Sequence, residues 1–195
     1  YTAPQVSLNP YFIQLPQCSI SSNPYGGATG TYGLLNCLAI QNGGLWAVIH
    51  FYYQPGVQGG ILEIQTPSQY PTGPGSWTTW IYIGSNGGID VTEYCSSGNF
   101  WTGFPPPTPG WHTLVVGEYY FNGKYYMVAY LDNSSDVATS TTTSLPSLFG
   151  YVGPYPYNDF GVVYTTPSHS GWFFFDGVIQ YIALFPGGPS VGSSL

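Results

Sequence analysis

Residues 111–133 read WHTLVVGEYYFNGKYYMVAYLDN, and this stretch predicts a β-hairpin at the centre of the fold. Asn122-Gly123 is the dipeptide that a type I′ turn prefers, because both central residues of that turn need a positive φ. The runs on either side alternate and are rich in Val and Tyr, as in strands. A two-residue loop predicts the cross-strand pairs Phe121–Lys124, Tyr120–Tyr125, Glu118–Met127, Val116–Ala129 and Leu114–Leu131.

One face of this hairpin is apolar, so we expect it to face the core. The face carries Leu114, Val116, Tyr120, Met127, Ala129 and Leu131. Glu118 falls on the same face, which leaves three interpretations: a functional site, the edge of the core, or a bulge near Gly117 that shifts the register. Burial would raise the pKa of this carboxyl and suit a general acid, so Glu118 is the first catalytic candidate.

Composition narrows the class of protein. A chain of 195 residues is ample for one β-sandwich domain, yet charged residues make up only 5%, against roughly 25% in an ordinary soluble domain. Lys124 is the single Lys or Arg, and the formal charge is −7. Nucleic acid is excluded as a partner, because neutralising phosphates needs Lys and Arg, and an anionic membrane surface is disfavoured for the same reason.

The setting that the composition favours is extracellular and acidic. Polarity comes from Ser, Thr, Asn, Gln and Tyr, and a fold with few ion pairs loses little stability when carboxylates protonate. The composition is similar to that of secreted proteins from acidophiles, so we expect an acid-stable protein outside the cell or on its surface. A start at Tyr1 fits a product from which a signal peptide was removed, although a chain cut there for another reason would look the same. No run of about 18 apolar residues predicts membrane insertion.

The three cysteines allow one disulfide and one thiol. They are Cys18, Cys37 and Cys95, and the sequence does not choose the pair. Their spacing matches no zinc pattern, so no metal site is predicted from them.

The rest of the chain predicts short strands separated by Gly and Pro turns. The expected strands are 32–40, 45–54, 61–65, 77–84, 89–95, 150–153, 159–165 and 172–185, with a loop over 96–110. The polar tract 134–147 is a loop or a strand that faces solvent. No helix is predicted, because no segment keeps apolar residues at helical spacing without Gly or Pro inside. This pattern predicts an all-β fold, a two-sheet antiparallel β-sandwich.

Three regions of the chain are expected to differ in role. Residues 1–24 form an arm broken by prolines, which suits an edge strand or a strand donated to a neighbouring copy in a homo-oligomer or filament. Residues 25–186 form the sandwich. Residues 187–195 are rich in Gly, Pro and Ser and predict coil or a linker.

Three pieces of sequence carry a resemblance to laminin-G-like and concanavalin A-like jelly rolls. They are Gly60-Ile61-Leu62-Glu63-Ile64 with Gly87-Gly88-Ile89, Gly110-Trp111-His112-Thr113-Leu114-Val115-Val116 with Tyr130-Leu131-Asp132-Asn133, and Phe175-Asp176-Gly177-Val178-Ile179-Gln180-Tyr181-Ile182. The resemblance covers roughly residues 45–185. It implies a two-sheet sandwich and, by fold analogy alone, carbohydrate binding as in lectins. Asn133 stands where the family usually has Gly, and no calcium or sugar ligand set can be placed residue by residue.

The chain also resembles glutamic peptidases, which share this sandwich type and have few basic residues. Their mechanism needs a Gln and a Glu that converge on one water, and Gln65 with Glu118 is the only pair that can be proposed here. The family's Ala-Glu-Trp-Ile-like strand is absent. The run Asp159-Phe160-Gly161-Val162-Val163-Tyr164 resembles a later strand of that family without its catalytic partner.

Other carboxylates are weaker candidates. Glu63 lies two residues before Gln65, so the two predict one strand face, either half of a glycosidase-like site or a solvated surface. Asp90 and Glu93 lie on opposite faces of one strand, which argues against a pair. Two further acids, Asp132 and Asp136, flank a turn. They could bind calcium with loop carbonyls, or close the turn through Asx hydrogen bonds.

The histidines His50, His112 and His169 have no metal-ligand spacing and are expected to be packed or hydrogen-bonded. Tyr and Trp exceed what the core needs. They either stack on sugar rings or replace charged residues at the surface of an acid-stable protein. Asn133-Ser134-Ser135 is a glycosylation sequon on a predicted turn.

Three functions compete at this stage. The sequence favours a non-catalytic protein of surface or filament assembly that could also bind glycans, because no convergent pair of acids stands out. The alternatives are a lectin-like carbohydrate-binding module and an acid hydrolase that uses Glu118 with Gln65 or Glu63. No cofactor is predicted apart from the calcium alternative.

Overall fold

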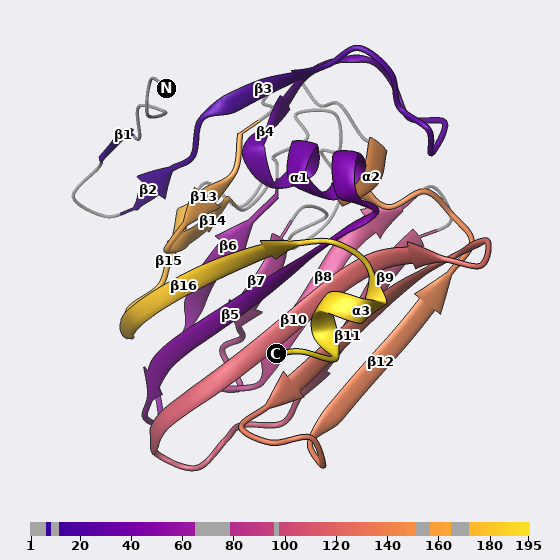
Figure 1. Cartoon of the computed structure of the whole chain (residues 1–195). Helices are drawn as coiled ribbons and strands as arrows, with labels where there is room; N and C mark the ends of the chain where they lie inside the picture. Colours follow the sequence, from indigo (N-terminus) through magenta and orange to yellow (C-terminus); the bar gives the residue numbers. More distant parts are fainter. Residues whose placement is uncertain (1–6, 9–11, 65–78, 96–97, 151–156, 165–171) are drawn as a thin grey trace.

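The computed structural model describes residues 7–8, 12–64, 79–95, 98–150, 157–164 and 172–195. They form two antiparallel sheets packed face to face, so the predicted all-β sandwich is confirmed (Figure 1). The five-stranded sheet has the order β12 (Val137–Thr142), β11 (Lys124–Leu131), β10 (Gly110–Phe121), β5 (Gly44–Tyr53) and β16 (Val178–Pro186). No helix in the described part of the chain is long and apolar enough to cross a membrane.

The second sheet has nine strands among the described residues. Its main path is β1 (Ser7–Leu8), β2 (Ile13–Gln14), β13 (Asp159–Phe160), β6 (Gly59–Glu63), β7 (Thr79–Ile83), β8 (Ile89–Cys95) and β9 (Gly98–Phe104). The strands β14 (Val162–Tyr164) and β15 (Trp172–Phe174) attach beside β6, where one bridge is parallel. A separate ribbon pairs β3 (Gln17–Ile20) with β4 (Gly30–Gly33).

The central hairpin has the register that the sequence predicts. All five expected pairs between β10 and β11 are present, and Asn122 and Gly123 have φ values of 49° and 80°. The pairing of β10 with β11 and with β5 continues without a shift past Gly117, so the bulge interpretation is wrong. Gly117 is needed for a different reason: a Cβ there would collide with the ring of Trp46 on the neighbouring strand.

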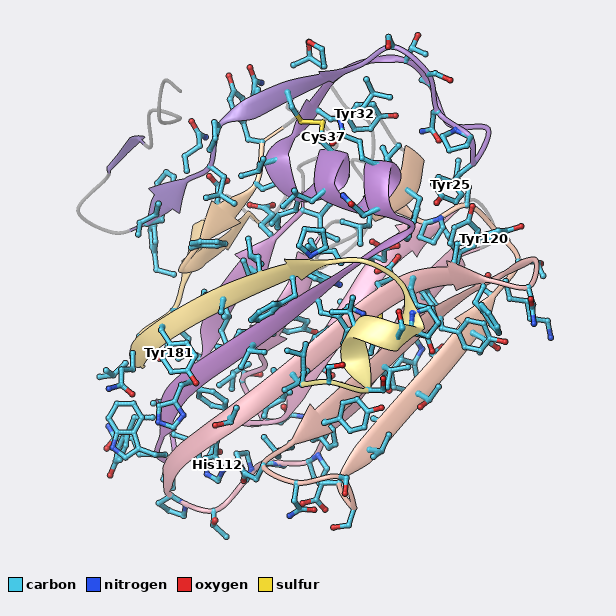
Figure 2. All side chains as sticks on the ribbon, in the orientation of Figure 1. Tyr25, Tyr32, Cys37, His112, Tyr120 and Tyr181 are labelled. Carbon is cyan, nitrogen blue, oxygen red and sulfur yellow. A yellow bond between two sulfur atoms is a disulfide. The ribbon has the colours of Figure 1, made fainter. Side chains whose placement is uncertain are left out.

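The core lies between the two sheets. On β10 and β11 the fully buried apolar side chains are Leu114, Val116, Met127 and Ala129, as predicted. Tyr120 lies at the exposed end of the same face, where its ring contacts the rings of Tyr25 and Tyr125 (Figure 2).

The expectation of no helix is wrong at α1 (Leu34–Asn42), which replaces most of the strand predicted over 32–40. Extended Gly33 precedes the helix, and Gly43 ends it in the left-handed region at φ 76°. The helix buries Leu35, Asn36, Cys37, Ala39 and Ile40. Because neighbouring positions such as these point in different directions around a helix, there is no narrow apolar stripe for periodicity to detect.

Four other segments differ from, or refine, the sequence-based expectation. The predicted loop 96–110 contains β9, and the polar tract contains β12, whose exposure alternates as in a strand with one face to solvent. The remaining helices are short: α2 (Ser147–Gly150), and α3 (Pro189–Gly192) in the tail expected to be coil.

The tail packs on the outer face of the five-stranded sheet, where the indole Nε1 of Trp46 donates to the Gly188 carbonyl at 3.0 Å.

The disulfide that the sequence left open joins Cys18 to Cys37 and so ties β3 to α1 (Figure 2). Cys95 is a buried thiol. Within the described part of the arm, β2 pairs with β13 of the same chain, and the Leu15 amide donates to the Asn158 carbonyl at 2.8 Å.

Candidate functional site

Two glutamates from opposite sheets meet inside the core. Glu118 on β10 and Glu93 on β8 are both fully buried. Glu93 Oε2 accepts a hydrogen bond from the Leu148 amide at 3.1 Å, at the start of α2. The polar groups that act on Glu118 are the Glu93 carboxyl, the Cys95 thiol and the buried indole N–H of Trp80.

Burial changes the acidity of both carboxyls. It raises the pKa of Glu93 to about 8, against an ordinary value of 4.5. It also raises the pKa of Glu118 well above its usual range, and the neighbouring Glu93 carboxyl and Cys95 thiol raise it further. In acid both groups are therefore neutral, and a neutral carboxyl can donate a hydrogen bond to its partner. This protonation explains how two acids occupy an apolar core.

Sequence reasoning placed Glu118 on the core face but missed Glu93 as its partner. Asp90 is only half-buried and Glu93 is fully buried, so the expectation that these two lie on opposite faces is confirmed. The missed signal is that Glu93 shares a face with Ile89, Val91 and Cys95, all of them buried. The same alternation that placed Glu118 inside therefore places Glu93 inside.

A second group of polar side chains lies on three neighbouring strands of the nine-stranded sheet, β2, β13 and β6. The strand register sets Gln14 opposite Asp159, and Asp159 opposite Glu63. Burial raises the pKa of Asp159 to about 6, partly offset by side-chain hydrogen bonds with Gln14 and Glu63. The interpretation of Glu63 as part of a solvated face is wrong, because Glu63 is fully buried where bulges in β6 interrupt the alternation. Gln65 lies outside the described residues.

The carboxylate of Asp132, one of the two calcium candidates, is held by residues of β10. Asp132 has φ 59°, and its carboxylate accepts the Thr113 amide at 2.9 Å and contacts His112 Nδ1 at 2.7 Å. The other ring nitrogen of His112 lies 2.6 Å from the Thr108 carbonyl oxygen. In the part of the chain that the structure describes, no three potential ligands gather as a metal site.

The outer face of the five-stranded sheet carries a row of exposed rings. His50 on β5 stacks between Trp111 of β10, at a centroid distance of 5.0 Å, and Tyr181 of β16, at 5.6 Å. The three rings are nearly parallel, with interplanar angles of 6° and 17°. Trp111 and Tyr181 remain 50% and 46% exposed. We call these three residues the ring platform.

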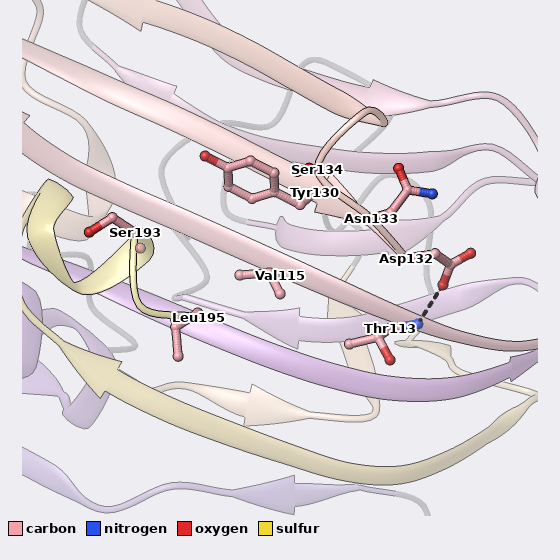
Figure 3. A pocket seen from close by; sticks show the side chains of 9 residues that line it. Thr113, Val115, Tyr130, Asp132, Asn133, Ser134, Ser193 and Leu195 are labelled. Atoms are coloured by element: carbon pink, nitrogen blue, oxygen red, sulfur yellow. Dashed lines mark hydrogen bonds between the residues drawn. The ribbon is translucent and has the colours of Figure 1, made fainter.

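A pocket of about 380 Å³ lies on the same face, beside the platform (Figure 3). Its walls come from β10, β11, the turn after β11 and the C-terminal tail. The lining residues are Thr113, Val115, Tyr130, Asp132, Asn133, Ser134, Gly192, Ser193 and Leu195. Thr113 joins the pocket to the platform, because its hydroxyl hydrogen-bonds to His50 Nδ1 at 3.0 Å.

The histidine expectation is confirmed where it can be followed. His50 is stacked and hydrogen-bonded, and His112 is held between Asp132 and Thr108. His169 lies outside the described residues. The sequence showed an excess of aromatic residues but did not identify which of them form an exposed row.

Comparison with known proteins finds similarity among solved structures alone. No family profile and no curated protein matches the chain. Among solved structures, the chain is similar to domains LG4-5 of the mouse laminin α1 chain, with a TM-score of 0.49, 14% identity and coverage of 95% of this chain and 43% of that one. It is also similar to the enzymatically active domain of tailspike protein 2 from bacteriophage CBA120, with a TM-score of 0.42, 10% identity and coverage of 97% and 28%.

The chain thus spans less than half the length of each of these two solved structures. The class itself rests on the two antiparallel sheets: this is an all-β sandwich of the jelly-roll type.

Proposed function

We propose that this chain is an extracellular, non-catalytic β-sandwich that binds carbohydrate on the outer face of its five-stranded sheet. The ring platform is the observation that carries the proposal. Exposed aromatic rings pack on the apolar faces of sugar rings, and Trp111 and Tyr181, at the two ends of the stack on His50, keep 50% and 46% of their surface exposed for that contact. The adjoining pocket supplies hydroxyl, amide and carboxylate groups for the sugar hydroxyls.

The buried acids favour a non-catalytic role. A hydrolase needs its carboxyls in contact with substrate and water. Glu118, Glu93 and Glu63 have essentially no exposed surface, so a substrate cannot reach them in this conformation. Their burial instead fits a protein that works in acid, where they stay protonated. The disulfide between Cys18 and Cys37 supports an oxidising, extracellular setting.

Trp111→Ala is expected to weaken binding by about tenfold or more, which corresponds to about 1.4 kcal/mol, because it removes the most exposed ring of the platform. A glycan array at pH 4 would select a ligand, and isothermal titration calorimetry would measure its affinity for each variant. Trp101→Ala is the matched control, since Trp101 is 63% exposed but lies on β9 of the other sheet. Equal losses in both variants, or an array with no ligand, would contradict the proposal.

Assembly through the N-terminal arm is the second candidate. The specific observation is that β2 joins β13 through only two residue pairs, Gln14 with Asp159 and Ile13 with Phe160. A neighbouring copy could provide the same strand. Because Cys18 is tied to Cys37, only residues before Cys18 are free to exchange in this way.

Deletion of residues 1–15 is expected to abolish oligomers or filaments of the full chain at pH 4, as seen by electron microscopy and light scattering. The control is a synthetic peptide of residues 1–15, which should occupy the vacant edge and restore the melting temperature of the truncated protein. The assembly candidate fails if the full chain is monomeric at high concentration and the deletion only lowers its melting temperature.

A further inference from the structure

We infer that the outer-face site takes neutral oligosaccharides and discriminates against anionic ones such as uronates. This inference rests on the proposed function and names the ligand class of the same site. Its basis is the distribution of charge around the ring platform and the pocket.

No strong cation is available to pair with an anionic sugar. Lys124 is the single Lys or Arg of the entire sequence. It pairs with Phe121 at the tip of the hairpin, at the opposite end of β10 from Trp111. Ten residues of extended strand separate Trp111 from Phe121, which is about 34 Å. That separation exceeds several Debye lengths at physiological salt, so Lys124 cannot attract a charge at the platform.

The two histidines near the site are already engaged. His112 lies between the Asp132 carboxylate and the Thr108 carbonyl, so both of its ring nitrogens face acceptors inside the protein. His50 is covered on both ring faces by Trp111 and Tyr181, and its Nδ1 contacts the Thr113 hydroxyl. Apart from the second ring nitrogen of His50, an anionic sugar would therefore find no basic side-chain donor among the residues described at this site.

The pocket lining contains one acidic side chain and no Lys, Arg or His. Asp132 lines it with a side chain that is 40% exposed. A carboxylate accepts hydrogen bonds from neutral sugar hydroxyls and repels a second carboxylate at short range. The formal charge of −7 on the whole chain acts in the same direction.

The arrangement also sets a minimum length for the ligand. Trp111 and Thr113 lie two residues apart on one face of β10, a separation of about 7 Å. Thr113 lines the pocket, while Trp111 ends the row of rings. A sugar residue stacked on the platform therefore has room for the next residue to enter the pocket, so the preferred ligand is at least a disaccharide.

The test compares neutral trisaccharides with their uronate counterparts. The three pairs are galactotriose with trigalacturonate, cellotriose with its glucuronate analogue, and mannotriose with trimannuronate. At pH 6 we expect at least one neutral member to bind about tenfold more tightly than its acidic partner. At pH 2.5 the two should agree within about twofold, because a sugar carboxyl with a pKa near that of an ordinary α-carboxyl, about 3.5, is then protonated.

A charge variant provides the second measurement. Ser134→Lys places a cation on the exposed rim of the pocket and should reverse the preference at pH 6. Gln41→Lys is the control, because it makes the same change in net charge at an exposed position on α1. Equal or tighter binding of a uronate by the unmodified protein at pH 6 overturns the inference and leaves the proposed function standing. Failure of all six sugars to bind overturns the proposed function itself.

Discussion

Raising the pH from 4 to 9 is expected to lower the free energy of unfolding by several kcal/mol. The folded-state pKa values of Glu93 and Glu118 lie above their unfolded value of 4.5, so the neutral carboxyls contribute fully below pH 4.5. Their contribution is lost as the pH rises through the folded pKa, which for Glu93 is about 8. At about 1.4 kcal/mol per pH unit, this interval is worth on the order of 5 kcal/mol for Glu93 alone.

Stability is lost at high pH because each ionised glutamate would face a second acidic group inside the core. An ionised Glu93 would face Glu118 with the backbone amides of Ser147 and Leu148 as its partners, while an ionised Glu118 would face Glu93 and the Cys95 thiol. Asp159 adds to the same trend at lower pH, since its pKa is raised to about 6. A loss of this size approaches the total stability of an ordinary domain, so we expect unfolding in mildly alkaline solution.

Denaturant unfolding followed by tryptophan fluorescence between pH 3 and pH 9 measures this effect. Glu118→Gln removes one ionisable group at almost constant volume, so it should flatten the decline above pH 5 and change little at pH 3. Asp136→Asn is the matched control, because Asp136 is exposed. Stability that is independent of pH, or highest at pH 8, would show that the buried pair does not control the pH dependence.

Asn158→Ala is expected to cost about 3–5 kcal/mol, because it leaves buried groups without partners. Asn158 Oδ1 accepts the Leu35 amide at 2.7 Å in the first turn of α1, and its Nδ2 donates to Asn36 Oδ1 at 3.1 Å. Asn36 in turn donates to the carbonyls of Ser147 and Leu148 in α2. The buried Asn158 side chain therefore bonds directly to α1 and is linked to α2 through Asn36.

Chemical denaturation at pH 4 would measure the loss. Asn42→Ala is the matched control, since Asn42 makes a comparable hydrogen bond to the Leu38 carbonyl at the exposed end of α1. That variant should lose about 1 kcal/mol or less. Similar small losses in both variants would mean that the network around Asn158 contributes little.

The hairpin could be predicted in detail because its determinants are local. Asn122-Gly123 fixes the turn, the turn fixes the register, and alternation then fixes which side chains enter the core. The helix α1 could not be predicted in the same way. Its side chains are buried in several directions, so the sequence carries no helical stripe, and its first turn depends on Asn158, more than a hundred residues away.

In the candidate sites, too, the local placement of a side chain could be predicted from the sequence, whereas contacts between distant strands could not. Alternation along β10 placed Glu118 inside, and the same alternation places Trp111 and Thr113 on the outer face. The sequence does not indicate that β8 faces β10 across the core. The contact between Glu93 and Glu118 could therefore be found only once the packing of the two sheets was known. The platform likewise needs the order β10–β5–β16, which sets Trp111, His50 and Tyr181 in one row.

A nuclear magnetic resonance titration of the indole N–H groups tests the central claim most directly. The chain has six tryptophans, and their signals can be assigned by single substitutions. On addition of the neutral sugar selected by the array, the platform predicts that the signal of Trp111 shifts in a saturable way while that of Trp101 stays in place. A saturable shift of Trp101 without one at Trp111 would contradict carbohydrate binding at the outer face of the five-stranded sheet.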